Sequence, residues 1–314
     1  MGTQVKVQRD GRVIVATLDN PPHGLMTPTM VAELDALSLE AEADEEIGAV
    51  VLTGAHPERF LAHYDVAALL AGAEGSPALS PRQARAIGGV VRGLERLPAV
   101  GPTLSKSPAA GMVELHAFHA TLSRLGATGA VWIAAINGAA MGGGCELALA
   151  CDLRLISAGG ILGQPEILLG FPPGGGGTQR LSRLIGRARA LEIILEGRPV
   201  EAEEALEIGM VHRVVEPDQL LAVAVETAER LARRSKAAVA AVKRSVLEGG
   251  SMSLAAGLRV EQSEFMATIA SAPSRRVMAS YVEHIERTGE LPAYDEGLRE
   301  QLQDGTFVDM NAPD

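Results

Sequence analysis

Aromatic side chains make up only 3% of the 314 residues, so alanine, valine, leucine and isoleucine must build most of any core. Because 47% of the chain is hydrophobic, there is enough apolar material for one large domain with an extension. No apolar stretch is long and charge-free enough to span a bilayer, and residues 1–10 lack the apolar segment of a signal peptide. We therefore expect a soluble, cytoplasmic protein with no membrane partner.

The chain also has fewer basic than acidic residues, and it has only two cysteines. The 28 lysines and arginines are outnumbered by 39 acidic residues, which gives a formal net charge of −11. Nucleic-acid binding depends on Lys and Arg contacts to phosphates, so no nucleic-acid partner is expected. The spacing of Cys145 and Cys151 fits no zinc pattern and does not suggest a disulfide, which favours a reducing compartment. His116 and His119 have no acidic or thiol partner at ligand spacing, so we expect no metal.

Short β-type runs alternate with helix-type patterns along the chain, which predicts an α/β protein. An Asp-Gly pair between the first two runs indicates a hairpin. The predicted strands are 5–7, 13–18, 47–53, 131–136, 153–157 and 210–215. The first predicted helix begins after Thr27 or Thr29 and ends near Asp44. Another is predicted to start near Thr178, and the others cover 111–125, 188–195, 202–207, 218–233, 237–247, 254–269 and 274–287.

Residues 72–110 shift in composition to Gly, Ser, Pro and Ala, which is typical of a surface insertion. Within them we predict a helix over 81–97, with Ser80 as N-cap and Pro81 in the first helical position. One stripe of this helix holds four arginines, Arg82, Arg85, Arg92 and Arg96. They fit a clamp for an anionic ligand, but a solvated face of an amphipathic helix is the favoured interpretation. The polar, acidic tail 291–314 is given no structure.

The rest of the chain is organised around a glycine turn, Gly142–Gly144, between a buried strand at 131–136 and an apolar helix at 146–151. Such a helix start leaves unpaired N–H groups pointing outward, where the helix dipole favours negative charge. Glu146 stands in the first turn beside these donors and is a candidate acid or base.

A second candidate acid, Glu166, ends the turn 163–166. The glycine run at 172–178 lacks the Lys-Ser/Thr ending of a phosphate-binding P-loop, which is excluded. The alternative for Glu146 and Glu166 is a pair of idle surface carboxylates. We disfavour it because an idle carboxylate in an apolar helix start is costly to bury.

Three motifs in this order resemble those of the crotonase superfamily, the enoyl-CoA hydratase and isomerase group, and most closely an enoyl-CoA hydratase. The motifs are AINGAAMGGGCEL at 135–147, GQPEILLG at 163–170 and PGGGGTQRL at 173–181. The resemblance covers the N-terminal strands, 47–65 and most of 131–248, and leaves 72–110 and the tail outside.

The resemblance implies an α/β spiral of repeated β-β-α units over 1–215, interrupted at about 72–110. It also implies a helical C-terminal trimerisation region over 216–290, followed by the acidic tail 291–314. A homotrimer or homohexamer is expected. No cofactor is implied, because coenzyme A is part of the acyl-CoA substrate.

The resemblance further implies hydration of 2-enoyl-CoA thioesters to 3-hydroxyacyl-CoA. The backbone N–H groups of Tyr64 and Gly143 would form an oxyanion hole for the thioester enolate, while Glu146 and Glu166 handle the water. The remaining expected oxyanion-hole or substrate-binding positions are Ala62, His63, Asp65, Gly142 and Gly174.

The sequence departs from the family pattern at Ala62–Asp65, which reads Ala-His-Tyr-Asp where Ala-Gly-Ala-Asp is usual. His63 therefore replaces a glycine, and either an acid–base role or a packing role is open to it. Three alternative functions remain: double-bond isomerisation, thioester hydrolysis, and non-catalytic acyl-CoA binding by a protein that has lost the oxyanion hole.

Overall fold

The computed structural model describes residues 2–74, 76–97, 100–104 and 107–312. The predicted insertion and tail therefore contain residues outside the described ranges, namely 75, 98–99, 105–106 and 313–314. The described strands form two sheets, with orders β1-β2-β3-β5-β7-β10 and β4-β6-β8-β9. The first contains β1 (Val5–Asp10), β2 (Val13–Leu18), β3 (Ala49–Gly54), β5 (Val131–Ile136), β7 (Leu153–Ser157) and β10 (Arg213–Val215), and the second contains β4 (Arg59–Leu61), β6 (Ala139–Met141), β8 (Ile161–Gly163) and β9 (Pro199–Glu201).

The chain repeats one unit three times. In each unit a strand of the large sheet is followed by a strand of the small sheet and then by helical structure: β3-β4, β5-β6 and β7-β8. Strands β3, β5 and β7 pair in parallel, and so do β4, β6 and β8. Parallel neighbours need long crossover connections, which the helices supply. This arrangement confirms the predicted spiral of β-β-α units.

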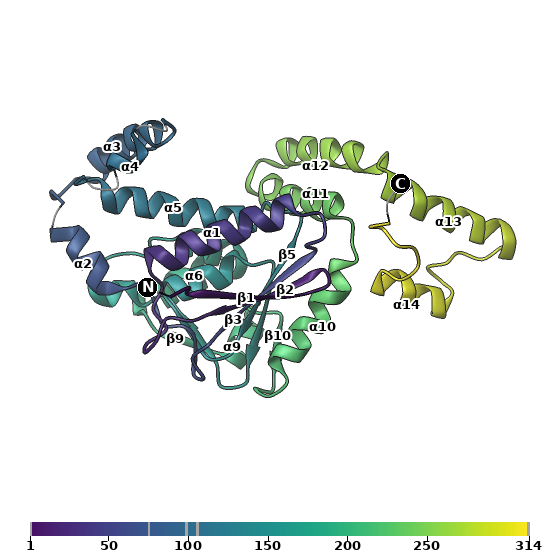
Figure 1. The fold of residues 1–314 in the computed structure, drawn as a ribbon, viewed down its shortest axis with the longest axis horizontal. Helices are drawn as coiled ribbons and strands as arrows, with labels where there is room; N and C mark the ends of the chain where they lie inside the picture. Colours follow the sequence, from purple (N-terminus) through teal and green to yellow (C-terminus); the bar gives the residue numbers. More distant parts are fainter. Residues whose placement is uncertain (1, 75, 98–99, 105–106, 313–314) are drawn as a thin grey trace.

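Alternating side chains of the large sheet face two different layers of helices. On β5, Trp132, Ala134 and Ile136 belong to the same buried cluster as the inner faces of α1 (Pro28–Ala43), α5 (Ala110–Leu125) and α6 (Gly143–Ala150). Residues Val131, Ile133 and Ala135 pack instead with the buried side of α10 (Leu220–Ala232). The period of two expected for a strand buried on both faces explains why β5 is apolar throughout. Figure 1 shows α1 and α5 on one side of the sheet and α10 on the other.

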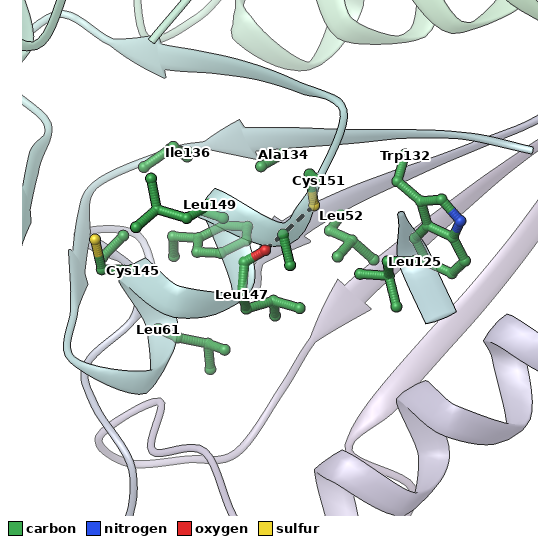
Figure 2. Close-up of a cluster of buried hydrophobic side chains, with 14 of the residues drawn as sticks. Leu52, Leu61, Leu125, Trp132, Ala134, Ile136, Cys145, Leu147, Leu149 and Cys151 are labelled. Atoms are coloured by element: carbon green, nitrogen blue, oxygen red, sulfur yellow. Dashed lines mark hydrogen bonds between the residues drawn. The ribbon is translucent and has the colours of Figure 1, made fainter. Parts of the chain in front are cut away.

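Helix α6 is buried along its whole length. Figure 2 shows its side chains Cys145, Leu147 and Leu149 among Leu52, Leu61 and Ile136 from neighbouring strands. The thiols of Cys145 and Cys151 are free and buried, and Cys151 donates to the carbonyl of Leu147. A short helix enclosed on every side fixes the position of any group at its N-terminus.

Most predicted helices agree with the structure to within a few residues. Thr27 caps α1, as expected, by accepting from the N–H of Met30 at 3.2 Å. Ser80 and Gln83 form a capping box at the start of α3 (Pro81–Glu95). The other helices are α2 (Val66–Glu74), α4 (Gly101–Leu104), η1 (Pro165–Leu169), α7 (Gly177–Ile185), α8 (Arg187–Glu196), α9 (Ala202–Glu207), α11 (Lys236–Leu247), η2 (Gly249–Ser251), α12 (Leu254–Ile269), α13 (Ala272–Thr288) and α14 (Glu296–Asp304). No helix within the described ranges is long and apolar enough to cross a membrane.

The tail was given no structure from the sequence, and this was wrong for residues 296–304, which form α14. Asp295 caps this helix by accepting from the N–H of Leu298 at 3.1 Å. The end of α14 is held by Arg234, whose guanidinium donates to the carbonyl of Leu302 at 2.8 Å. Composition alone therefore missed a helix that a cap and a distant arginine stabilise.

Candidate active site

The glycine turn leads directly into α6, which begins at Gly143 and not at Glu146 as predicted. Gly142 has φ +50°, a conformation that side chains disfavour, and its N–H donates to the carbonyl of Gly163 at 2.8 Å. Gly144 packs against β4 so closely that an added Cβ would lie 2.5 Å from the carbonyl oxygen of Leu61. These contacts hold the N-terminus of α6 against both β4 and β8.

Tyr64 and Gly143 are neighbours at the start of α6, and their backbone N–H groups are the two candidate donors. The loop after β4 pairs with Met26, which donates to the carbonyl of His63 and accepts from the N–H of Asp65. That pairing leaves the N–H of Tyr64 without an acceptor among the described residues. Gly143 is the first residue of α6, where an N–H has no partner within the helix. A Cβ added at Gly143 would lie 3.4 Å from the Tyr64 nitrogen, so the two residues are neighbours.

Glu146 lies one turn into α6 and is 2% exposed. Its Oε1 accepts a 2.8 Å hydrogen bond from the N–H of Gly177, the first residue of α7. Burial raises the pKa of Glu146 to about 7, the charge of Glu166 adds to the increase, and the Gly177 N–H opposes it. A carboxyl with this pKa exchanges its proton readily at neutral pH, as a general acid or base requires.

Glu166, on η1, is buried and faces the same site. Burial raises its pKa, while its own backbone N–H and the nearby His63 lower it. The amide of Gln164 fits its surroundings when its nitrogen faces Glu166, 3.2 Å from both carboxylate oxygens. Gln164 is fully buried. Sequence reasoning assigned it no role, although it stands two residues before the predicted acid.

A cavity of about 1220 Å³ connects these groups. Seven of the nine predicted site residues line it, whereas Ala62 and Asp65 do not. The N–H of Ala62 is used by the carbonyl of Gly24, and the carboxylate of Asp65 accepts from Ala67 and Ala68 at the start of α2. The seven that line the cavity are His63, Tyr64, Gly142, Gly143, Glu146, Glu166 and Gly174.

Aromatic side chains of the cavity wall include Tyr64, Phe118 and Phe171, and the ring centroids of Tyr64 and Phe118 lie 5.9 Å apart. Burial raises the pKa of Tyr64 to about 12, so its hydroxyl stays protonated at neutral pH. The Tyr64 residue therefore offers the site a backbone N–H and a neutral ring.

His63 points its Nδ1 at the carbonyl oxygen of Tyr64, 2.8 Å away. Its Cβ would be 3.3 Å from a Cβ added at Gly142, so it packs against the glycine turn. Of the two roles that the sequence left open for His63, these contacts therefore favour packing and hydrogen bonding over an acid–base role.

The two histidines of α5 have separate partners. The Nδ1 of His116 lies 2.9 Å from Glu95 on α3, and His119 bonds the carbonyl of Gly174. Glu95 is an acidic partner that the spacing did not reveal. Within the described ranges, no group of three or more His, Cys, Asp and Glu side chains is arranged to hold a metal ion. The four arginines of α3 are exposed and do not line the cavity, as expected for a solvated face.

Comparison with known sequences identifies the family to which the chain is related. The profile of the enoyl-CoA hydratase/isomerase family matches residues 81–288, including much of the segment that we had placed outside the resemblance. The chain is 32% identical to the short-chain-enoyl-CoA hydratase of Clostridium acetobutylicum over 282 residues, covering 89% of this chain and 94% of that protein. It is 34% identical to a probable enoyl-CoA hydratase of Rhizobium meliloti over 277 residues, covering 88% and 93%.

Solved structures share the fold. An enoyl-CoA hydratase from Geobacillus kaustophilus superposes with a TM-score of 0.74 at 26% identity, covering 90% of this chain and 95% of that one. An enoyl-CoA hydratase from Bacillus anthracis gives a TM-score of 0.72 at 28% identity, covering 90% and 96%. Fold and sequence together thus define a crotonase-fold enzyme. The chain belongs to the enoyl-CoA hydratase/isomerase family, which confirms the resemblance drawn from its motifs.

Proposed function

We propose that this enzyme hydrates 2-enoyl-CoA thioesters to 3-hydroxyacyl-CoA. The observation that carries the proposal is the placement of two buried carboxylates, Glu146 and Glu166, in one cavity with the N–H groups of Tyr64 and Gly143. The names of the relatives point to the same reaction.

In the proposed reaction the thioester carbonyl oxygen lies between the N–H groups of Tyr64 and Gly143. Water, held by the two glutamates, loses a proton to the carboxylate pair as its oxygen bonds to C3. The C2–C3 π electrons move toward the carbonyl and form an enolate, whose oxygen the two N–H groups stabilise. A proton from the pair then bonds to C2, so that one water is added overall. Each fixed donor is worth about 3–4 kcal/mol to such a transition state.

The two carboxyls suit this task because their pKa values are raised together. A coupled pair titrates as a unit, so a proton given up by water and a proton delivered to C2 belong to the pair and not to one residue. The burial that raises both pKa values also keeps bulk water away from the enolate. The reaction uses no group beyond the substrate, the backbone donors and these side chains.

An assay separates hydration from the other reactions of this superfamily. Loss of the conjugated thioester absorbance of a 2-enoyl-CoA with formation of the 3-hydroxy product supports the proposal. Release of free coenzyme A thiol would indicate hydrolysis, and conversion of a 3-enoyl to a 2-enoyl thioester would indicate isomerisation. Binding of the thioester with none of these changes would indicate a non-catalytic protein.

We further propose that the chain forms a homotrimer, or a hexamer built from trimers, through its C-terminal helices. Large apolar side chains on α11 and α12 stay exposed in the single chain: Val242 is 62% exposed, Leu254 80% and Met266 62%. Exposed apolar surface of this kind marks association surfaces. Light scattering of the purified protein should give a mass of three or six times 32.7 kDa, and a mass of 32.7 kDa would contradict the assembly.

A further inference from the structure

The cavity continues away from the two glutamates along one face of α5. Phe118 stands at the reactive end, since a Cβ added at Gly175 would lie 2.2 Å from its ring and 2.4 Å from the Glu146 carboxylate. Leu115 and Met112, one and two turns earlier on α5, also line the cavity. At about 1.5 Å per residue, the helix from Phe118 back to Gly111 follows the cavity for roughly 10 Å.

The outer wall of this extension comes from the segment 72–110 and from α2. Leu69 on α2, Leu79 before α3 and Ile87 on α3 all line it. We call the part of the cavity lined by Leu69, Leu79, Ile87, Met112 and Leu115 the tail channel. Figure 1 shows α2, α3 and α4 near the N-terminal end of α5.

Helix α3, which contributes to the outer wall of the tail channel, packs onto α5. Val91 on α3 is buried, and Glu95 at its end is paired with His116. A Cβ added at Gly88 would lie 3.4 Å from the sulfur of Met112, which places the middle of α3 against the channel. The tail channel therefore lies where α3 approaches α5.

The chemistry of the wall selects the occupant. The described residues that line the whole cavity include no lysine or arginine, and Glu114 is the only acid besides the two site glutamates. A phosphate group would need cationic or N–H donors along the channel, whereas a hydrocarbon chain needs only apolar contact. The channel starts at the group that would hold the reacting carbons, so its occupant is continuous with them.

We propose that the tail channel binds the hydrocarbon tail of a medium-chain or long-chain acyl thioester; this rests on the proposed function. With C–C bonds of about 1.5 Å, a channel of roughly 10 Å takes about eight zigzag carbons beyond the reacting ones. Each buried methylene strengthens binding about fourfold. The preferred substrates therefore have acyl chains of about eight to twelve carbons, unlike those implied by the name of the short-chain relative.

The test compares kcat/KM of the full-length protein for 2-enoyl-CoA thioesters with four, eight and twelve acyl carbons. The tail channel predicts that the eight-carbon and twelve-carbon substrates exceed the four-carbon one by at least about tenfold, because binding of the remote chain helps the reacting end. Values that stay level or fall with chain length would overturn the proposal.

A pair of variants on one helix locates the effect. Ile87→Trp fills the channel, so the twelve-carbon to four-carbon ratio of kcat/KM should fall by about tenfold or more. Val90→Trp is the matched control, because Val90 is 63% exposed on α3 and does not line the cavity. Its ratio should equal that of the wild type. If both variants have the same twelve-carbon to four-carbon ratio of kcat/KM, the proposed role of the tail channel is wrong.

Failure of the proposed function can be distinguished experimentally from failure of the tail-channel proposal. If no 2-enoyl thioester of any length is turned over, the hydratase proposal fails, and the channel is then judged by binding alone. Calorimetry with the saturated butanoyl-CoA and dodecanoyl-CoA should show at least about tenfold tighter binding of the longer chain. Equal affinities would overturn the tail channel.

Discussion

The N–H of Gly177 donates a 2.8 Å hydrogen bond to Oε1 of Glu146, so the first residue of α7 holds the carboxylate in the first turn of α6. A helix N-terminus favours a negative charge, yet the pKa of Glu146 rises to about 7 because burial outweighs that favourable contact. The protein keeps this carboxyl half-neutral at neutral pH at the cost of some stability.

That cost predicts a pH dependence of folding. The unfolded carboxyl ionises near pH 4.5, whereas the folded one holds its proton to about pH 7. Between these values the folded state binds more protons, so the free energy of unfolding falls as pH rises, by about 3 kcal/mol in total. Glu146→Gln keeps an acceptor for Gly177 but cannot ionise, so it should gain stability over the wild type at pH 8 and little at pH 5.

Urea denaturation of both proteins at the two pH values measures this difference. Glu207→Gln, at an exposed position on α9, is the control and should follow the wild type at both. If Glu146→Gln and the wild type change in parallel with pH, then the carboxyl of Glu146 is ionised in the folded state at all these values and the pKa argument is wrong.

Gly143 and Gly144 are adjacent at the start of α6, but their substitution by alanine should have different effects on turnover and stability. In Gly143→Ala the new methyl would meet Met26 and Tyr64 at 3.4 Å, an ordinary contact, but it stands beside the two N–H groups. Turnover should fall by about 10²-fold or more with the melting temperature nearly unchanged. In Gly144→Ala the methyl would meet the Leu61 carbonyl at 2.5 Å, so that variant should lose stability first. A fully active Gly143→Ala enzyme would remove Gly143 from the oxyanion hole.

His63 should act on the backbone and not as a proton carrier. Because its Nδ1 is engaged with the Tyr64 carbonyl, His63→Gln should lower kcat by less than about tenfold and leave the shape of the pH–rate profile unchanged. Loss of one limb of the pH–rate profile in this variant would instead assign it an acid–base role.

Much of this fold was predictable because local signals and burial agree. The caps at Thr27 and Ser80, the Asp-Gly hairpin and the apolar β5 each place an element within a few residues of where it lies. In the site, Glu146, Glu166 and the glycine turn were identified as candidates from their motifs. Each carboxylate stands where burying it without a function would be costly.

Features that depend on contacts between distant residues were not predictable. Glu95 reaches His116 only when α3 packs on α5. The sequence motif also could not show that the N–H of Ala62 donates to the Gly24 carbonyl, or that the carboxylate of Asp65 accepts from the start of α2. The spacing of residues in the sequence does not show which partner each hydrogen-bonding group will take in the folded chain.

A buried cation on α11 supports the region behind the site. The ammonium group of Lys243 donates to the carbonyls of Leu125 and Ala130 and to the carboxylate of Asp152, all within 2.9 Å. Lys243→Met would leave Asp152 without its cation and should cost about 3–5 kcal/mol of unfolding free energy. Lys6→Met, which breaks an exposed pair with Asp19, should cost less than about 1 kcal/mol. Equal losses in chemical denaturation would contradict the assigned role of Lys243.

The proposed chemistry depends most on the two glutamates. We would follow the loss of 2-enoyl-CoA absorbance with the wild type, Glu146→Gln and Glu166→Gln, after confirming by circular dichroism that all three are folded. Turnover by the wild type and a drop of about 10²-fold or more in each variant is the predicted result. An inactive wild type, or variants as fast as the wild type, would contradict the proposal that this pair adds water to the thioester.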